Sequence, residues 1–312
     1  MKSLHSTRHE FQHGLIDKPT FIRTMYEEHH YALYDYASYI GQTNIRKIEI
    51  EDNQVIMTTK DRGIRLLCSA KDYRIAPIEI LNFLDYEKDE YSMIDNLSAE
   101  CRSIIDIGAN IGLYALNMAV SNRSAKIFCF EPIPKTFSVL QENIRLNSVN
   151  NIHAFNFGLS DENNEFLFYY YPEGSGNASS VNVSERSDIE TVTCQVKKMD
   201  TYFATEGIHA DFIKCDVEGA ELLVFKGGQT VISRDCPIVF SEILRKWSAK
   251  FNYNPNEIFT FFANLGYRAF TAKNNYLHAF SVMDEKTVET NFFFLHNENH
   301  KELIKRYEYM TA

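Results

Sequence analysis

The segment Ser103–Gly112 (SIIDIGANIG) decides the fold of this chain. The apolar run Ser103-Ile-Ile predicts a short strand that ends at Asp106, and the apolar stretch LYALNMAV after Gly112 predicts a helix. A strand, a glycine turn and a helix are typical of the first unit of a nucleotide-binding half-fold. Glycine lets a ligand approach the backbone, and the helix start offers free N–H groups.

Asp106 in this turn narrows the class of ligand. The glycine spacing is G-x-x-x-G, which differs from the dinucleotide fingerprint G-x-G-x-x-G. An acid at the strand end repels a pyrophosphate and favours an ammonium or sulfonium, such as the methionine part of S-adenosylmethionine. A glycine turn without any ligand is the alternative.

The sequence after residue 100 alternates between short apolar runs and amphipathic stretches. This rhythm is typical of a parallel, doubly wound sheet covered by helices. The predicted core strands are 103–107, 125–130, 151–157, 211–215, 237–241, 267–270 and 291–295. The segments EFLFYYY and TVTCQV predict additional strands, so residues 100–312 read as one α/β domain with a β-insertion near 160–200.

Residues 1–99 predict a smaller α+β extension. We expect a polar arm, a tyrosine-rich helix, a β-hairpin with a third strand, and two further helices, over 1–20, 20–41, 46–68, 76–85 and 88–99 respectively. The tyrosine-rich helix is interpreted as a packing or dimer surface. No catalytic motif stands out in this part of the chain.

Acidic residues follow two other predicted strands. Glu131 lies about 20 residues beyond the glycine turn, where an acid can accept both ribose hydroxyls of a nucleoside. Asp216 ends the strand DFIKC, and Glu218 follows it. Ligands of open α/β sheets bind beyond the carboxyl ends of the strands, so we expect both to face the same crevice as Asp106. Glu221 is interpreted as a helix-start charge or a cap partner instead of a catalytic residue.

These motifs together resemble a known family. DIGANIG, FEP and FIKCDVEGAELLVFKGG, in this order and spacing, resemble the FkbM family of S-adenosylmethionine-dependent methyltransferases over roughly residues 100–270. The resemblance implies a Rossmann-like class I methyltransferase sheet with strand order 3-2-1-4-5-7-6, in which residues 291–295 form the antiparallel strand 7. It also implies S-adenosyl-L-methionine as cofactor and O-methylation of a hydroxyl on a sugar, glycan or secondary metabolite.

The resemblance also implies the cofactor-binding residues. These are Asp106, Gly108, Ala109, Asn110, Gly112, Glu131, Pro132, Ser160, Asp161 and Asp216. The glycine turn corresponds to the methionine side, Glu131 to the ribose, the Ser160-Asp161 pair to the adenine, and Asp216 to the transferred methyl group. The family usually has K-I-D where this chain has Lys214-Cys215-Asp216.

An alcohol nucleophile needs its proton removed or its oxygen polarised, so carboxylates near the crevice are the candidate catalytic residues. They are Asp216, Glu218 and Glu242, with His278 as a further candidate base. Glu242 follows the strand PIVFS and could also hold Mg²⁺ with Asp216 or shape the pocket floor. No metal site is assigned.

The predicted insertion contains a segment rich in small polar residues. Gly176, Asn177, Ser179 and Ser180 form a candidate substrate loop, because they offer flexible backbone and hydroxyl or amide partners. A plain surface hairpin is the alternative.

Composition restricts the partners. The 312 residues carry a net charge of −10, which disfavours broad nucleic-acid binding. We expect no membrane span, because no run approaches the roughly 20 apolar residues required. Six scattered cysteines and a polar N-terminus favour a cytoplasmic protein. The expected partners are a hydroxyl-bearing small molecule or glycan acceptor and a second copy bound through the N-terminal region.

Two other functions are compatible with parts of this pattern. A non-catalytic methyltransferase-fold subunit or scaffold would keep the cofactor site without transferring a methyl group. An NAD-dependent oxidoreductase would share the fold class, but the missing G-x-G-x-x-G fingerprint argues against it.

Overall fold

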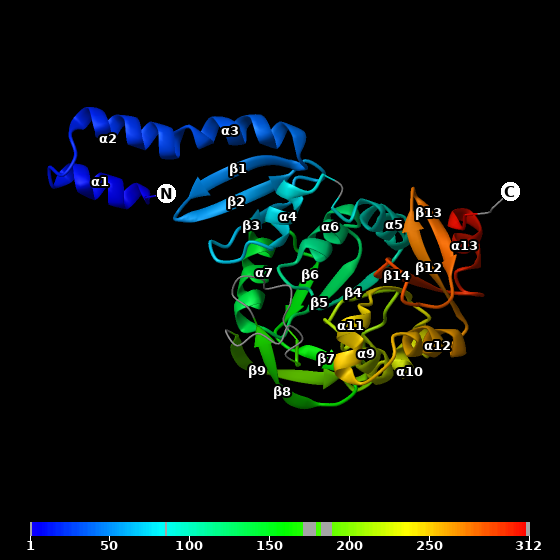
Figure 1. Cartoon of the computed structure of the whole chain (residues 1–312). Coiled ribbons are helices and arrows are strands. Elements are labelled where there is room, and N and C mark those ends of the chain that lie inside the picture. Colours follow the sequence, from blue (N-terminus) through cyan, green and yellow to red (C-terminus); the bar gives the residue numbers. More distant parts are fainter. Residues whose placement is uncertain (1, 85, 171–178, 182–188, 310–312) are drawn as a thin grey trace.

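A computed structural model describes residues 2–84, 86–170, 179–181 and 189–309 (Figure 1). Its centre is an eight-stranded sheet with the order β13-β12-β14-β11-β10-β4-β5-β6. The strands are β4 (Ser103–Ile107), β5 (Lys126–Phe130), β6 (Ile152–Phe155), β10 (Phe212–Cys215), β11 (Ile238–Glu242), β12 (Tyr267–Lys273), β13 (Tyr276–Phe280) and β14 (Asn291–His296).

Most of this sheet is parallel. Strands β6, β5, β4, β10 and β11 pair in parallel, whereas β14 lies antiparallel between β11 and β12. If β4, β5, β6, β10, β11, β12 and β14 are numbered one to seven, their order is 3-2-1-4-5-7-6. The predicted doubly wound α/β fold is confirmed. The edge strand β13, which pairs with β12, was not predicted.

Helices cover both faces of the sheet because its strands are apolar on both sides. Successive residues of a strand point to opposite faces, and the neighbours Ile104 and Ile105 accordingly belong to two different buried clusters. One cluster includes residues of α8 (Met199–Glu206), α9 (Glu221–Gly227), α10 (Gln229–Asp235) and α12 (Asn256–Asn264). The other includes residues of α5 (Lys88–Ser98), α6 (Leu113–Ser121), α7 (Pro134–Leu146) and α13 (Lys301–Tyr307). The short α11 (Arg245–Ser248) follows β11.

The predicted insertion forms a separate three-stranded sheet. Its strands are β7 (Gly158–Ser160), β8 (Asn164–Tyr170) and β9 (Glu190–Lys198), in the order β7-β9-β8. The two strands expected from EFLFYYY and TVTCQV are therefore present. Strand β7 adds a parallel partner for β9.

The N-terminal extension contains the expected hairpin and helices. Its elements are α1 (Leu4–Gln12), α2 (Lys18–Met25), a π-helical turn (Tyr26–His30), α3 (Ala32–Tyr39), β1 (Ile45–Glu51), β2 (Gln54–Thr59), β3 (Arg65–Leu67), α4 (Ala76–Asn82) and α5. The prediction of a polar arm over residues 1–20 is wrong. Ser3 caps α1 and Asp17 caps α2 through backbone N–H groups, so polar residues initiate helices here.

Helices α2 and α3 bury none of their side chains and project away from the main domain (Figure 1). Several tyrosines on them are exposed, namely Tyr26, Tyr31, Tyr34, Tyr36 and Tyr39. Dimerisation through this region stays a prediction. In the part of the chain that the structure describes, none of the helices is both long and apolar enough to cross a membrane.

Asparagines of α7 attach the hairpin of the extension to the main domain. The Asn143 side chain is fully buried, and its Oδ1 accepts the N–H of Leu67 at 2.9 Å. Its Nδ2 donates to the carbonyl of Ile111 at 2.8 Å. Asn147 accepts the N–H of Arg65 at 2.8 Å. Strand β3, which pairs with β2 of the hairpin, is therefore fixed to the turn that follows β4.

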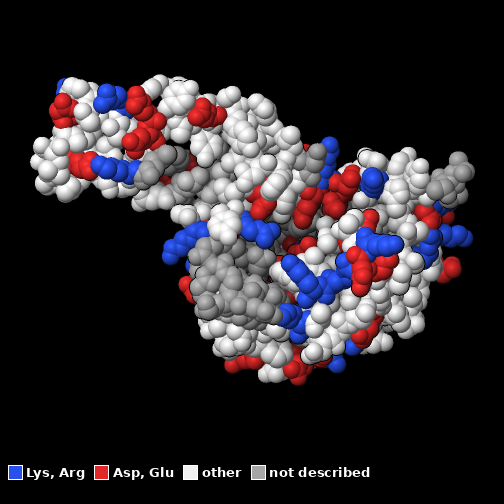
Figure 2. Space-filling model, in the orientation of Figure 1, with Lys and Arg blue, Asp and Glu red and all other residues white. Residues whose placement is uncertain are grey.

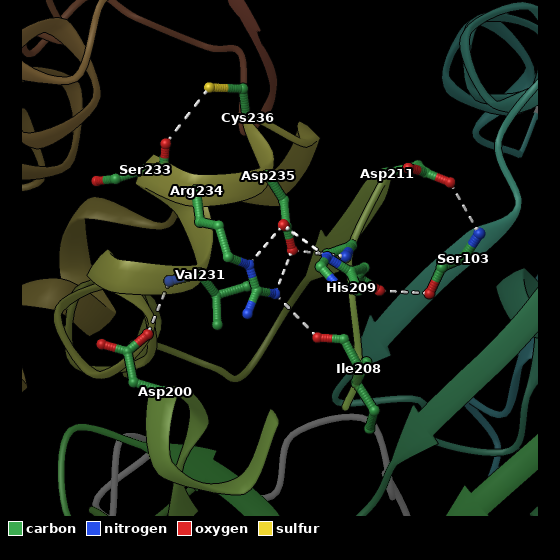
Figure 3. Close-up of polar contacts among 11 residues, drawn as sticks. Ser103, Asp200, Ile208, His209, Asp211, Val231, Ser233, Arg234, Asp235 and Cys236 are labelled. Carbon is green, nitrogen blue, oxygen red and sulfur yellow. Dashed lines mark hydrogen bonds and ion pairs between the residues drawn. The ribbon is translucent and has the colours of Figure 1, made fainter. Parts of the chain in front are cut away.

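A polar network fixes the opposite end of the sheet, where β4 and β10 begin (Figure 3). The Asp211 carboxylate accepts the N–H of Ser103 at 3.0 Å, and the Ser103 hydroxyl donates to the carbonyl of His209. Asp235 pairs with Arg234 at 2.6 Å and contacts the His209 ring at 3.0 Å. These contacts hold the strands in register and leave their carboxyl ends for a ligand site.

We predict that Asn143→Ala destabilises the protein by about 2 kcal/mol or more, because it leaves two buried backbone groups without partners. Urea unfolding followed by circular dichroism measures the change. Asn150→Ala, at an exposed position, is the matched control. Equal stability of the two variants would contradict the proposed attachment of the hairpin.

Candidate active site

The turn after β4 packs directly against the loop after β10. Gly108 has φ +73°, and a Cβ at this position would lie 1.8 Å from the carbonyl oxygen of Asp216. Gly112 has φ +89°, and its Cβ would lie 2.4 Å from Leu140. Both positions need glycine because the backbone is left-handed and the space is filled. The carboxyl ends of β4 and β10 are thereby brought together.

A buried lysine joins these two loops. Lys214 in β10 is 3% exposed, and its ammonium lies 3.3 Å from Asp106 and 3.6 Å from Asp216. It also donates a hydrogen bond of 2.7 Å to the carbonyl of Gly108. Burial opposes the charge on Lys214, but the two carboxylates outweigh burial and raise the pKa of the ammonium.

This contact changes the interpretation of Asp106. Its side chain is fully buried and faces the Lys214 ammonium, and it is not among the described residues that line the two cavities of this site. A direct contact of Asp106 with a cofactor stays a prediction. The charged Lys214 within an apolar strand was the sequence signal for this ion pair, and sequence reasoning did not use it.

A cavity of about 330 Å³ lies beyond the ends of β4, β5 and β10. Its walls are mostly apolar and include Ile133, Leu159, Phe166, Phe168, Val196 and Leu223. Polar side chains enter it at Asn110, Glu131, Ser160, Ser180, Asp216 and Glu218. Such a concave apolar site with a few polar groups is typical of a small-molecule pocket.

Glu131 lies in the wall of this cavity and links two loops. Its carboxylate accepts the N–H of Asn110 at 3.0 Å and the N–H of Ile133 at 2.9 Å. Burial raises the pKa of Glu131 to about 7, although these two hydrogen bonds oppose the shift. A carboxylate has about four acceptor sites, so Glu131 can accept further hydroxyl donors.

The other predicted cofactor residues do not all line the same cavity. Gly108, Asn110, Pro132 and Ser160 line the same cavity as Glu131, together with Asp216. Ala109 lines a neighbouring cavity instead. Asp161 is exposed and accepts the hydroxyl of Ser160 at 3.2 Å. Asn110 has φ +48°, and its Oδ1 is buried with no hydrogen-bond partner in the described part of the chain.

The neighbouring cavity has a volume of about 410 Å³ and is strongly polar. Acidic side chains line it at Glu79, Glu87, Asp216, Glu218 and Glu242. Basic and aromatic side chains line it at Arg74, Lys214, Lys246, Tyr86, Tyr114 and Trp247. In Figure 2, acidic side chains are visible inside the hollow on this face, with Lys and Arg around its rim. The two cavities share Asn110, Asp216 and Glu218.

The structure brings the three predicted catalytic carboxyls together at the second cavity. Burial and the neighbouring Asp216 raise the pKa of Glu242 to about 9, and they raise the pKa of Glu218 well above its usual value. The Glu242 carboxyl is therefore protonated at neutral pH and can donate a hydrogen bond, and the shift at Glu218 favours the same neutral form. His278 lies on the edge strand β13 and stacks on Tyr309, outside both cavities.

Glu221 has the structural role expected for it. Its carboxylate accepts the N–H groups of Val217 and Gly219 at 3.1 and 3.0 Å, and Tyr253 donates to its other oxygen at 3.3 Å. These contacts hold the loop that carries Glu218.

The candidate substrate loop is only partly described. Ser179 is buried, and its hydroxyl donates to the carbonyl of Glu218 at 3.0 Å. Ser180 lines the first cavity. Gly176 and Asn177 lie outside the described residues. Within the described ranges, no group of three or more His, Cys, Asp or Glu side chains could hold a metal ion.

Sequence reasoning missed the part of the second cavity that the extension supplies. Arg74, Glu79, Tyr86 and Glu87 come from the segment around α4 and the start of α5. Tyr114 and Trp247 come from α6 and α11. These residues are far apart in the sequence, and only the packing of the extension brings them together.

The doubly wound sheet, with cavities at its carboxyl edge, defines a Rossmann-like fold. Residues 106–269 match the FkbM methyltransferase domain, and the chain belongs to this family. A solved FkbM methyltransferase from Methylobacillus flagellatus is 18% identical, with a TM-score of 0.39, and the match covers 70% of this chain and 53% of that one.

Several curated relatives are named as methyltransferases. The chain is 28% identical over 142 residues to Methyltransferase 1 of Beauveria bassiana, and the match covers 40% of this chain and 57% of the relative. It is 28% identical over 141 residues to the hexuronic acid methyltransferase AglP of Haloferax volcanii, covering 45% and 56%. It is 27% identical over 146 residues to the 2-O-methyltransferase NoeI of Sinorhizobium fredii, covering 42% and 59%. The chain therefore spans less than two thirds of the length of these relatives.

We predict that Glu242→Gln makes stability less dependent on pH. The pKa of Glu242 is higher in the folded protein than in an unfolded chain. The stability that its protonated form contributes is therefore fully present below about pH 4.5 and is lost as the pH rises toward about 9. The amide stays neutral, so the variant gains about 1 kcal/mol or more relative to the wild type between pH 5 and pH 9.

Thermal unfolding across this pH range measures the effect. The exposed Glu206→Gln on α8 is the control and leaves the pH dependence of the wild type unchanged. Parallel curves for Glu242→Gln and the wild type would show that Glu242 is not protonated in the folded protein.

Proposed function

We propose that this protein is an S-adenosylmethionine-dependent O-methyltransferase that acts on a hydroxyl of a sugar, glycan or secondary metabolite. The observation that carries the proposal is the meeting of two different cavities at Asn110, Asp216 and Glu218. One cavity is mostly apolar, as an adenosine requires, and the other is rich in hydrogen-bonding groups. Methyl transfer needs such an arrangement, because donor and acceptor must be held in line.

The residues of the first cavity fit S-adenosylmethionine. Its volume of about 330 Å³ lies within the range of small-molecule sites. Glu131 would hold the ribose, and the buried, unpartnered Oδ1 of Asn110 would accept a donor on the methionine side. Leu159 and Phe166 would contact the adenine. When bound, the cofactor supplies a methyl group carried on a sulfonium sulfur.

The second cavity suits a polyol acceptor. The raised pKa of Glu218 and of Glu242 favours their neutral carboxyls, which can both donate and accept hydrogen bonds, as the hydroxyls of a sugar require. Trp247 and Tyr114 add aromatic surface to the same cavity. Two relatives carry names that refer to a hexuronic acid and to 2-O-methylation, which agrees with a sugar acceptor. Asp216, held by Lys214, lies between the two cavities and would orient the hydroxyl.

We predict that Glu131→Ala weakens binding of S-adenosylhomocysteine about 10- to 100-fold, because hydrogen bonds from the ribose to a charged acceptor are lost. Glu131→Gln keeps one acceptor oxygen and gives an intermediate loss. Isothermal titration calorimetry measures the affinities, and Glu206→Ala is the exposed control. Thermal unfolding of each variant shows whether the protein is still folded at the temperature of the titration, so that a loss of affinity can be assigned to the site.

Absence of S-adenosylhomocysteine binding by folded wild-type protein would overturn the proposal. Binding without methyl transfer to any component of a cell extract would instead favour the non-catalytic subunit.

A further inference from the structure

Glu87 is an acidic residue of the second cavity that no sequence motif indicates. It precedes α5 in the N-terminal extension, outside residues 106–269 that match the family domain. The hydroxyl of Tyr114 donates a hydrogen bond of 2.6 Å to its Oε2. Tyr114 in turn stacks on Tyr91 with ring centroids 4.7 Å apart, and the Lys214 ammonium lies 5.4 Å from its ring. Tyr114, a residue of the main domain, thus holds the Glu87 carboxylate in place.

The backbone of Glu87 supports a defined position for this side chain. Its φ is +48°, in the left-handed region that residues other than glycine seldom adopt. Such a conformation persists only where the surroundings determine it. The packing of α5 onto the main sheet through Met93 and Ile94 supplies this support.

Resting on the proposed function, we propose that Glu87 accepts the proton of the acceptor hydroxyl, so that the extension supplies a catalytic residue. In this step a bond forms between the acceptor oxygen and the methyl carbon. The bond between that carbon and the sulfur breaks, and its electron pair stays on the sulfur, which becomes a neutral thioether. The hydroxyl proton moves to the Glu87 carboxylate.

The other carboxyls of the cavity are less suited to this task. Asp216 already pairs with the Lys214 ammonium at 3.6 Å, so its carboxylate is engaged in an ion pair. The pKa of Glu242 is raised to about 9, so its carboxyl is protonated at neutral pH, and burial raises the pKa of Glu218 well above its usual value. Burial raises the pKa of Glu87 to about 7, against the hydrogen bond from Tyr114, so a large fraction is ionised near neutral pH. A base works best when its pKa lies near the working pH.

Charged and titratable groups face Glu87 from several elements. Asp216 and Glu90 raise its pKa, and Lys214 lowers it. Glu242 lies near enough for Glu87 to raise the pKa of its carboxyl. The neighbouring Tyr86, Tyr91 and Tyr114 stay neutral because burial raises the pKa of each phenol. Arg74, Glu79 and Lys246 line the same cavity. Titration of Glu87 near neutral pH is therefore expected, and its substitution is needed to identify it because the pKa of Glu131 is also raised to about 7.

The test compares wild type, Glu87→Gln and Glu87→Asp with Glu100→Gln, an exposed control at the end of the extension. Transfer of labelled methyl from S-adenosylmethionine to a cell extract of the organism that carries this chain is measured between pH 5.5 and 9. Wild-type transfer is expected to rise with an apparent pKa of about 7. Glu87→Gln is expected to lose about 100-fold or more and to lose this rise, whereas Glu87→Asp recovers part of both.

Two further readouts do not depend on transfer. Calorimetry is expected to give wild-type affinity of Glu87→Gln for S-adenosylhomocysteine. Carbon-13 NMR of labelled glutamate carboxyls is expected to show a titration near pH 7 that is missing in Glu87→Gln and present in Glu100→Gln.

The outcomes separate the two proposals. Wild-type protein that transfers no methyl group contradicts the proposed function, and the role of Glu87 with it. If the wild type is active and Glu87→Gln is equally active, only the role of Glu87 is overturned. The same holds if Glu87→Gln keeps the rise of activity with pH seen in the wild type. The role of Glu87 is also overturned if Glu87→Gln no longer binds S-adenosylhomocysteine. It is likewise overturned if the spectrum of Glu87→Gln shows every carboxyl titration that the wild type shows.

Discussion

The ammonium of Lys214 is the interaction on which the site depends. It is buried in the central strand β10 and contacts Asp106 at the end of β4, the carbonyl of Gly108 and the carboxylate of Asp216. A buried charge needs partners of this kind, and removing one partner of a buried pair commonly costs about 3–5 kcal/mol. The contacts fix the separation of two strand ends and leave Asp216 between the two cavities. The geometry of both cavities follows from this arrangement.

The N-terminal extension completes the second cavity instead of lying apart from it. Asn143 ties its hairpin to the turn after β4, and Met93 and Leu97 of α5 lie in a core cluster with Ile104. The extension and the family domain therefore share one packed interior. One wall of the second cavity therefore comes from outside residues 106–269, which match the family domain.

The sequence predicted the sheet and the first cavity because both depend on local patterns. Apolar runs end in Asp106, Glu131 and Asp216, and parallel strands bring such ends to one edge. It did not predict Glu87 or Trp247 in the site, since tertiary packing alone places them there. The arm predicted over residues 1–20 is helical instead, because the polar residues Ser3 and Asp17 cap the starts of α1 and α2.

A crystal structure with bound S-adenosylhomocysteine tests the central claim most directly, namely that Lys214 holds two cavities together at Asp216. The account predicts ribose hydroxyls within hydrogen-bond distance of Glu131, and the sulfur at the opening between the cavities beside Asn110 and Asp216. It also predicts that Lys214 keeps its contacts with Asp106 and Asp216. A nucleoside bound in the second cavity, or a sulfur directed away from Asp216, would contradict it.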